Sequence, residues 1–307
     1  MSQHRAGRVG LIGRPNVGKS TLLNRVLGQK VAATADKPQT TRTRVAGIHT
    51  GEGFQAILVD TPGLHKPRSR LNQAMVQAAL DTLVAADLLV WLLDAPEVTA
   101  RVRQGGEALA GGDAWIAEQI DATGKPLIMA LNKVDRIERP WLLPALEACH
   151  TRMPEAVLVP ISALKGDGVA DLLAEIGARL PVGEAPYPED QLMEDSERSV
   201  VAEIIREKVI RLTEREIPYV TAVEIERFDE SERDAGLVRI HARILVERAS
   251  QKGIVIGKGG SLLKRVGTQA RRDVESLLGC RVHLELFVAV EEDWTRNPRL
   301  LHELGYE

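Results

Sequence analysis

The stretch Gly13-Arg14-Pro15-Asn16-Val17-Gly18-Lys19-Ser20 fits the phosphate-binding loop pattern G-x-x-x-x-G-K-[ST] at every fixed position. Glycines at this spacing let successive backbone N–H groups turn inward around a phosphate, and the following helix points its positive end at the same place. The pattern requires a strand before it and a helix after it, and residues 8–12 and 20–27 supply both. The stretch therefore predicts a nucleotide site in which Lys19 reaches the β- and γ-phosphates and Ser20 binds Mg²⁺.

Length and composition limit the remaining interpretations. The chain has 307 residues, of which 44% are hydrophobic, so two domains with sizeable cores are expected. A formal net charge of −3 gives no general reason to expect nucleic acid, so any such prediction needs local charge asymmetry. Cys149 and Cys280 lie far apart without metal-site spacing, which favours a reducing compartment. With no apolar run longer than Leu88 to Leu93 and no signal peptide, a cytoplasmic protein is expected.

Two further segments resemble the mobile switches of nucleotide-dependent proteins. Residues 34–44 are polar and rich in threonine, and Thr41, with Thr40 as the alternative, is expected to close over Mg²⁺ and the γ-phosphate. Asp60-Thr61-Pro62-Gly63 follows a predicted strand, so its carboxylate can hold the metal's water shell while the Gly63 N–H contacts the γ-phosphate. The polar and basic residues 65–72 are expected to form the second switch.

The choice of base is predicted from Asn132-Lys133-Val134-Asp135, which follows the buried strand 126–131. A carboxylate at Asp135 can accept from both N1–H and the exocyclic amine of guanine, whereas adenine offers no such pair of donors. A buried polar group left unpaired discriminates by roughly 10⁴-fold or more. Asn132 is expected to brace the loop and Lys133 to lie along the base, while a backbone N–H of Ser162-Ala163-Leu164 meets the guanine O6.

A second domain is predicted after a proline-rich linker. Residues 1–181 are expected to form an α/β, doubly wound P-loop domain, 182–191 a semi-rigid linker, and 192–307 an α+β domain. In the second domain a helix over 196–213 precedes strands over 219–228 and 237–247, and a last strand covers 282–288.

The predicted working part of the second domain is the loop Gly257-Lys258-Gly259-Gly260, which fits the G-x-x-G clamp of KH domains. Six basic and no acidic residues lie between Lys252 and Arg272, in a chain that is acidic overall. The order helix, strand, strand, helix, G-x-x-G, helix, strand is that of type II KH domains. RNA contacts are therefore expected at Lys252, Ile254, Val255, Ile256, Gly257, Lys258, Gly259, Gly260, Lys264 and Arg271.

These motifs together resemble the bacterial Era family of GTPases. The resemblance rests on residues 13–20, 38–42 and 60–65 and extends through 187–190, 203–208 and 282–286, so it covers nearly the whole chain. It implies a GTP/GDP- and Mg²⁺-binding GTPase that binds the 3′ end of small-subunit (16S) rRNA and assists maturation of the small ribosomal subunit. It also implies a peripheral fraction at the inner membrane, for which the residues offer no anchor, and we expect a monomer.

One departure from classical GTPases has a chemical consequence. Leu64 follows the D-x-x-G glycine where those enzymes place a water-orienting glutamine, so slow hydrolysis is expected. In related enzymes with a hydrophobic residue here, an asparagine matching Asn16 helps to hold K⁺, so potassium dependence is a hypothesis. What completes the site, whether an arginine such as Arg42, the RNA or the ribosome, stays open.

The residues predicted for the GTP site have three roles. Lys19, Thr41 and Gly63 are expected to support catalysis, and Ser20, Thr41 and Asp60 to surround the metal. The nucleotide contacts are expected at Gly13, Arg14, Pro15, Asn16, Val17, Gly18, Lys19, Ser20, Thr21, Asp60, Thr61, Pro62, Gly63, Asn132, Lys133, Val134, Asp135, Ser162, Ala163 and Leu164. Two alternatives stay open: a metabolic phosphotransferase that uses the same loop, and a GTPase whose second domain docks a protein.

Overall fold

The structure, a computed structural model, describes residues 4–35, 37, 40–64 and 70–306. Asp36, Pro38 and Gln39 of the expected first switch, and residues 65–69 of the second, lie outside the described residues. By their contacts the residues form two compact units: Met1–Gly28, Arg44–Pro67 and Val76–Glu194 make the first, and Gln29–Thr43, Arg68–Met75 and Asp195–Glu307 make the second. Within the described ranges no helix is both long enough and apolar enough to cross a membrane.

The first unit is built on a six-stranded sheet with the order β2-β3-β1-β4-β5-β6. Its strands are β1 (Arg5–Ile12), β2 (Val45–Gly51), β3 (Phe54–Asp60), β4 (Leu88–Asp94), β5 (Leu127–Asn132) and β6 (Val157–Ile161). Only β2 runs antiparallel to its neighbour in this sheet. The other five strands therefore end at one edge, which is where ligands bind in open α/β sheets.

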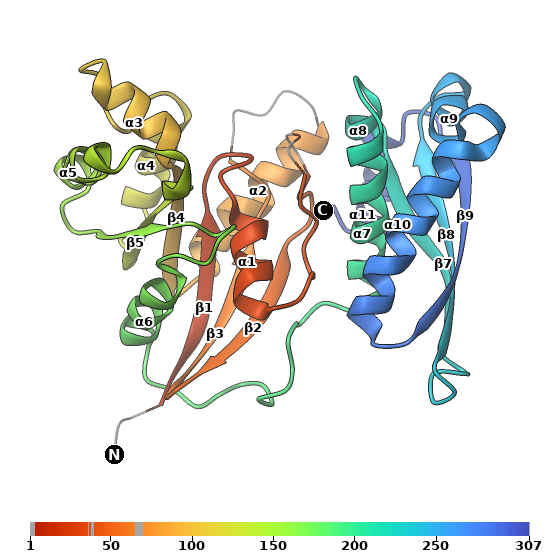
Figure 1. Ribbon diagram of the computed structural model, residues 1–307, viewed down its shortest axis with the longest axis horizontal. Coiled ribbons are helices and arrows are strands. Elements are labelled where there is room, and N and C mark those ends of the chain that lie inside the picture. Colours follow the sequence, from red (N-terminus) through yellow and green to blue (C-terminus); the bar gives the residue numbers. More distant parts are fainter. Residues whose placement is uncertain (1–3, 36, 38–39, 65–69, 307) are drawn as a thin grey trace. The chain divides into compact units, whose positions relative to one another are not determined.

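Helices cover both faces of this sheet, as the apolar runs of β4 and β5 require. The two on the near face in Figure 1 are α1 (Lys19–Leu27) and α6 (Val169–Arg179). The others are α2 (Arg70–Ala85), α3 (Ala95–Arg103), α4 (Gly112–Asp121) and α5 (Leu142–Arg152). One apolar cluster joins residues of these four helices to β4 and β5, with Trp91 fully buried at its centre. This confirms the doubly wound P-loop fold.

The predicted linker is fixed to the first unit rather than free. The Gly183 N–H donates to the His4 carbonyl at 3.0 Å, and Tyr187 exchanges two hydrogen bonds with the Gln55 side chain. Farther along, Glu194 forms a bidentate ion pair with Arg8 at 2.8 Å. The chain thus keeps contact with the first unit as far as Glu194, three residues beyond the predicted end of the linker.

The second unit has a three-stranded sheet with the order β7-β8-β9, formed by β7 (Ala222–Asp229), β8 (Leu237–Val246) and β9 (Arg281–Val290). The pair β7/β8 is antiparallel, and β8/β9 is parallel. Its helices are α7 (Glu197–Leu212), α8 (Ile217–Val220), α9 (Ala249–Ile256), α10 (Ser261–Leu278) and α11 (Pro298–Glu303), with the G-x-x-G turn between α9 and α10. The type II KH order is confirmed.

Three local predictions differ from the structure. Tyr219, expected to open a strand, lies in the short helix α8, because Pro218 occupies its first turn, where proline is tolerated. Helix α3 was not predicted, although Asp94 caps it by accepting from the Glu97 N–H at 3.2 Å. The glycine-rich residues 104–111 connect α3 to α4, and α4, for which the residues after them predict a helix only from Trp115, begins at Gly112.

The two cysteines offer a direct test of the packing. Cys149 is fully buried in α5, and burial raises its pKa to about 11, whereas Cys280 is half-buried. At pH 8 we expect one thiol per chain, Cys280, to react quickly with Ellman's reagent, and the second to react only as the protein unfolds. A Cys280→Ser variant should show no fast phase. Rapid modification of Cys149 in the folded protein would contradict this packing.

Candidate functional site

The phosphate loop lies between β1 and α1, at the edge where the parallel strands end (Figure 1). Gly18 has a φ of 104°, and a Cβ there would lie 2.3 Å from the Asn132 side-chain nitrogen, so only glycine fits. Asn16, with a φ of 63°, turns its carbonyl to accept from Lys133 Nζ at 2.7 Å. Backbone geometry and two neighbouring side chains thus fix the shape of the loop.

The loop lysine is already placed within the cradle. Lys19 is buried, and its Nζ donates to the Gly13 and Arg14 carbonyls at 3.1 Å each. Burial lowers the pKa of this ammonium to about 8, an effect partly opposed by the negative charge of Asp60. A bound phosphate would supply the full counter-charge that the two carbonyls lack.

The predicted metal ligands Ser20 and Asp60 are brought together. Ser20 Oγ, in the first turn of α1, donates to Asp60 Oδ2 at 2.6 Å, and Asp60 is the last residue of β3, the strand beside β1. No cluster of three or more His, Cys, Asp or Glu side chains suited to a metal occurs among the described residues. Two oxygen ligands nevertheless fit Mg²⁺, which keeps several waters and takes its remaining ligands from substrate phosphates.

The residues after Asp60 approach the phosphate loop closely. A Cβ on Gly63 would lie 2.5 Å from the Pro15 nitrogen, so the two loops touch backbone to backbone. Leu64 donates its N–H to the Gly13 carbonyl at 3.1 Å and buries its side chain in the core. The aliphatic residue at the water-orienting position is therefore a packing residue. Thr61 is likewise fixed, donating to the Leu11 carbonyl at 2.9 Å.

Asn132 joins the predicted base-recognition loops to the phosphate loop. Its Nδ2 donates to the Val17 carbonyl at 2.7 Å, and its Oδ1 accepts from the Ala163 N–H at 2.9 Å. Ser162 Oγ donates to Asp135 Oδ1 at 2.7 Å, which orients the carboxylate predicted to read guanine. The brace expected of Asn132 is therefore present in the geometry, and the three segments converge at one edge of the sheet.

Thr41 is the exception among the predicted ligands. Ser20 and Asp60 belong to the first unit, whereas Thr41 and Thr40 belong to the second, with the rest of residues 29–43. The Thr40 hydroxyl donates to the Lys37 carbonyl at 2.7 Å. The assignment of a metal-binding threonine stays a prediction.

Two acidic residues near the loop were missed from sequence. Asp94, at the end of β4, pairs with Lys133 Nζ at 2.5 Å, and Asp113 pairs with Arg14 at 3.4 Å and Arg101 at 2.7 Å. Asp94 could have been found from its place at the carboxyl end of a strand. Asp113 gave no such signal, because the glycines around it obscured the start of α4.

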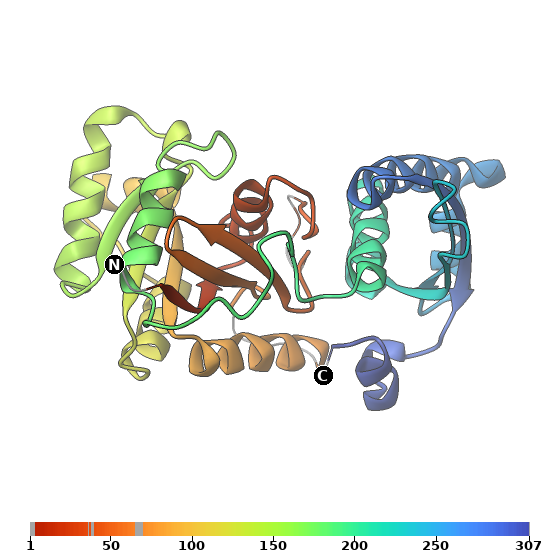
Figure 2. The same ribbon diagram turned by 90° about the horizontal axis from the view of Figure 1, so that it is seen from below.

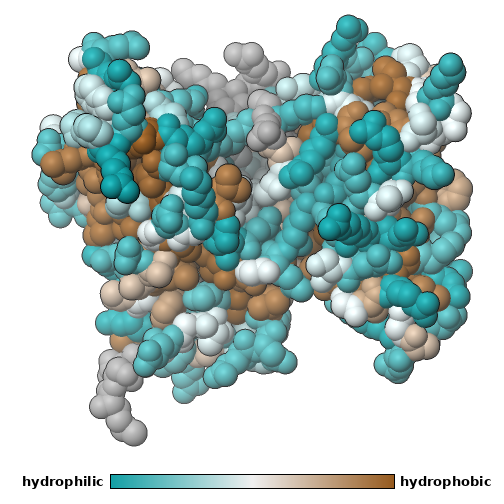
Figure 3. All heavy atoms as spheres, in the orientation of Figure 1, coloured by the Kyte–Doolittle hydropathy of each residue, from teal (hydrophilic) through white to brown (hydrophobic). Residues whose placement is uncertain are grey.

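Of the ten predicted RNA contacts in the second unit, five are exposed and four, Lys252 among them, are half-buried. Gly257, Gly259 and Gly260 have φ values of 73°, 59° and 78°, which a clamp formed by the backbone requires. Hydrophobic atoms reach the surface over α9 (Figure 3), where Ile254 is 48% exposed. Among the basic residues, those with exposed side chains are Lys258, Lys264, Arg265, Arg271 and Arg272.

One predicted RNA contact is wrong. Val255 is 0% exposed, so it packs in the core and cannot line a groove. On a helix the neighbours of an outward residue rotate inward, so the three consecutive residues 254–256 cannot all face the same groove. Ile254 and the half-buried Ile256 stay candidates.

The state of Lys19 leads to a test by pH. Because a phosphate stabilises the ammonium, GDP binding above pH 8 must be accompanied by protonation of Lys19. The dissociation constant for Mg²⁺·GDP should therefore rise about tenfold between pH 7 and 9, with proton uptake visible by calorimetry in buffers of different ionisation enthalpy. Lys19→Arg, which stays charged, should lose this dependence. A constant affinity over that range would contradict the assignment.

Comparisons with known proteins agree with this geometry. The family model described as "50S ribosome-binding GTPase" matches residues 8–133, and that of the KH domain matches 216–295. Curated GTPase Era proteins match at 48% identity in Geobacter metallireducens, over 98% of both chains, and at 44% in Lacticaseibacillus paracasei, over 100% and 98%.

Two solved structures match nearly the whole chain at 38% identity and a TM-score of 0.91. One is Era in complex with MgGDPNP and nucleotides 1506–1542 of 16S ribosomal RNA, with 99% of both chains covered. The other is a variant of Aquifex aeolicus Era bound to GDP·AlF4⁻, covering 98% of this chain and 99% of that one. With phosphate loop, base-recognition loops and KH turn all in place, this chain belongs to the Era family of GTPases.

Proposed function

We propose that this GTPase is a slow GTP-driven switch that binds the 3′ end of small-subunit rRNA and assists maturation of the small ribosomal subunit. The observation that carries the switch is the convergence of Lys19, the Ser20–Asp60 pair and the Asn132 brace at one edge of the sheet. The similarity to Era in complex with a 16S rRNA segment supports the choice of RNA. GTP, GDP and Mg²⁺ are the ligands implied.

The proposed hydrolysis is an in-line attack of water on the γ-phosphate. Lys19 and the loop N–H groups neutralise charge on the phosphates, and Gly63 offers an N–H to the γ-phosphate. Mg²⁺, held by Ser20 and Asp60 with Thr41 as the predicted third ligand, would add positive charge between the phosphates. Because Leu64 is buried and aliphatic, nothing at its position orients water, so unassisted turnover is slow.

Guanine selection follows from the Asp135 carboxylate. The Ser162 hydroxyl holds Oδ1 at 2.7 Å, and Lys165 Nζ lies 4.0 Å from Oδ2, beyond hydrogen-bond distance, so Oδ2 and the second lone pair of Oδ1 can accept from the two guanine donors. A phosphotransferase would have no use for this second grip on the base. The alternative of a metabolic kinase therefore loses its support.

The RNA proposal rests on the second unit. The G-x-x-G turn presents three glycines in conformations that side chains resist, and five exposed basic residues lie on it and on α10. A backbone clamp of this kind takes single-stranded RNA, with phosphates beside the basic residues and bases near Ile254. Phosphate contacts also predict a steep dependence on salt.

The test is equilibrium binding of a labelled RNA with the sequence of the small-subunit rRNA 3′ tail. We expect tight binding that depends on whether Mg²⁺·GDPNP or GDP is present and that weakens about tenfold or more between 50 and 200 mM salt. Replacing Gly259 and Gly260 by Asp should abolish it, because both residues have positive φ and the new carboxylates repel phosphate.

The matched control is Arg299→Asp, which changes an exposed charge on α11 outside the basic segment. Its RNA affinity should stay within about twofold of the original. Absence of RNA binding in every nucleotide state would instead favour the alternative in which the second unit docks a protein.

Potassium dependence is a finer part of the proposal. Asn16 lies in the loop with φ 63°, and a hydrophobic residue occupies position 64, the combination that accompanies K⁺ in related enzymes. GTP hydrolysis should be faster in KCl than in NaCl at equal ionic strength, by about tenfold, and Asn16→Ala should remove the difference. Equal rates in the two salts would exclude the ion.

Three further expectations stay proposals. They are a cytoplasmic location, a peripheral fraction at the inner membrane, and a monomeric state.

A further inference from the structure

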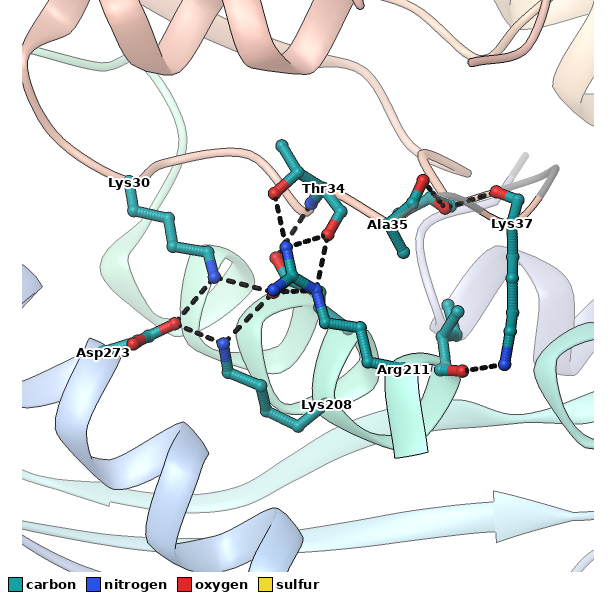
Figure 4. A network of polar contacts seen from close by, with 10 residues as sticks. Lys30, Thr34, Ala35, Lys37, Lys208, Arg211 and Asp273 are labelled. Atoms are coloured by element: carbon teal, nitrogen blue, oxygen red, sulfur yellow. Dashed lines mark hydrogen bonds and ion pairs between the residues drawn. The ribbon is translucent and has the colours of Figure 1, made fainter. Parts of the chain in front are cut away.

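Described residues of the first switch, and Lys30 just before it, contact helices of the second unit. Figure 4 shows Lys30, Thr34 and Lys37 in contact with residues of α7 and α10. Lys30 Nζ pairs with Glu207 at 2.7 Å and with Asp273 at 2.6 Å. The Glu207 carboxylate, fully buried, also accepts from the Thr34 N–H at 2.8 Å. The segment is therefore held by its backbone as well as by its side chains.

The contacts continue along the segment. Arg211 Nε donates to the Thr34 carbonyl at 2.8 Å, and Lys37 Nζ donates to the Ile210 carbonyl at 2.7 Å (Figure 4). Arg206 donates to the Thr40 carbonyl. Successive anchors thus lie on the same helix, α7.

The last anchor is Arg42, whose residue is only 1% exposed. Its Nη1 donates to the Thr221 carbonyl at 2.8 Å, and its Nη2 donates to the Pro218 and Tyr219 carbonyls at 2.8 and 2.9 Å. Two aromatic rings lie 5.9 Å from the guanidinium carbon. The Arg42 cage consists of the carbonyls of Pro218, Tyr219 and Thr221 and the rings of Trp294 and Tyr306.

The same cage contacts Leu71 of the second switch and the next turn of α2. Leu71 and Met75, at the start of α2, pack in one apolar cluster with Trp294 and Tyr306. Trp294 is fixed in turn, since its Nε1 donates to the Val220 carbonyl at 2.9 Å. Residues from both switch segments thus surround the same two rings.

The contacts of the cage stabilise the charge of Arg42 only in part. No carboxylate pairs directly with Arg42 among the described residues, and its Nε has no hydrogen-bond partner there. Burial lowers the pKa of Arg42, and the nearby charge of Arg206 lowers it further. Glu203, a carboxylate whose charge acts on Arg42, is bound bidentately by Arg206, at 2.7 and 2.5 Å. A buried guanidinium held by carbonyls and aromatic rings, without a directly paired carboxylate, retains much of its desolvation cost, so other contacts can replace these.

We propose that the Arg42 cage is a receptor for the first switch, occupied when Mg²⁺ and the γ-phosphate are absent and vacated when Thr41 binds them. The proposal rests on the proposed GTP switch and adds the site that competes with it. Thr41 lies between two anchored residues, Thr40 and Arg42, so its backbone cannot move to a new ligand while both anchors hold. Binding of Mg²⁺·GTP must therefore first break the cage contacts of Arg42. The free energy of these contacts is subtracted from the binding free energy of Mg²⁺·GTP, so the cage lowers the affinity for it.

The experiment compares full-length variants by their affinity for a fluorescent GDPNP with Mg²⁺ and for GDP. Arg42→Ala removes the occupant, so its affinity for Mg²⁺·GDPNP should rise about tenfold relative to GDP, a typical coupling between two sites. Arg44→Ala, two residues along and exposed, loses the same charge and should leave the ratio unchanged. Thermal unfolding checks that each variant is folded.

A second variant changes a residue of the cage instead of Arg42. Trp294→Phe removes the indole and its bond to Val220 while leaving Arg42 in place, so the ratio should rise by about threefold. Adding Arg42→Ala to it should give no more than Arg42→Ala alone, because both act on one contact.

The outcomes separate two failures. If the unaltered protein shows no Mg²⁺-dependent binding of GDPNP, the GTP switch itself is overturned, and the cage proposal with it. If that binding is normal but Arg42→Ala equals Arg44→Ala, or binds GDPNP more weakly, the cage proposal alone is overturned. Additive effects of Arg42→Ala and Trp294→Phe would also overturn it.

Discussion

The nucleotide site depends above all on the two hydrogen bonds of the Asn132 amide. One reaches the Val17 carbonyl in the phosphate loop and the other the Ala163 N–H, so a single side chain sets the distance between the grip on phosphate and the grip on base. Gly18 must lack a side chain for this amide to approach. The strands β1, β5 and β6 are parallel and end together, which brings these segments of distant sequence within reach of one side chain.

A second constraint is the lack of a water-orienting side chain. Leu64 is used for the core, and its N–H ties the second switch to Gly13. A site arranged in this way can bind GTP well and still hydrolyse it slowly, because transition-state stabilisation depends on groups that approach only when the switches close. Slow hydrolysis suits a protein that must stay in its GTP-bound state for as long as it binds a large RNA.

Much of this organisation could be predicted from sequence because each motif is local. The phosphate loop, Asp60 to Gly63, Asn132 to Asp135 and the G-x-x-G turn each lie at the end of a strand or helix, where a few adjacent residues determine the backbone. Val255 was misassigned because exposure depends on how a helix packs. Asp113 was missed because its partners, Arg14 and Arg101, are remote in sequence. The attachment of Arg42 to the second unit was equally out of reach, since backbone carbonyls carry no sequence signal.

The attachment of the first switch changes how the second unit can sense nucleotide. Pro218, Tyr219 and Thr221, whose carbonyls hold Arg42, lie immediately before β7, and Trp294 and Tyr306 follow β9. The cage is therefore formed where the chain enters and leaves the KH sheet. Coupling between two binding sites is reciprocal. If RNA binding changes the stability of the cage and so alters the affinity for Mg²⁺·GTP, then Mg²⁺·GTP alters the affinity for RNA by the same factor. A contact composed of carbonyls and rings suits this role, because it binds a cation firmly enough to be specific and lacks the ion pair that would make the contact permanent.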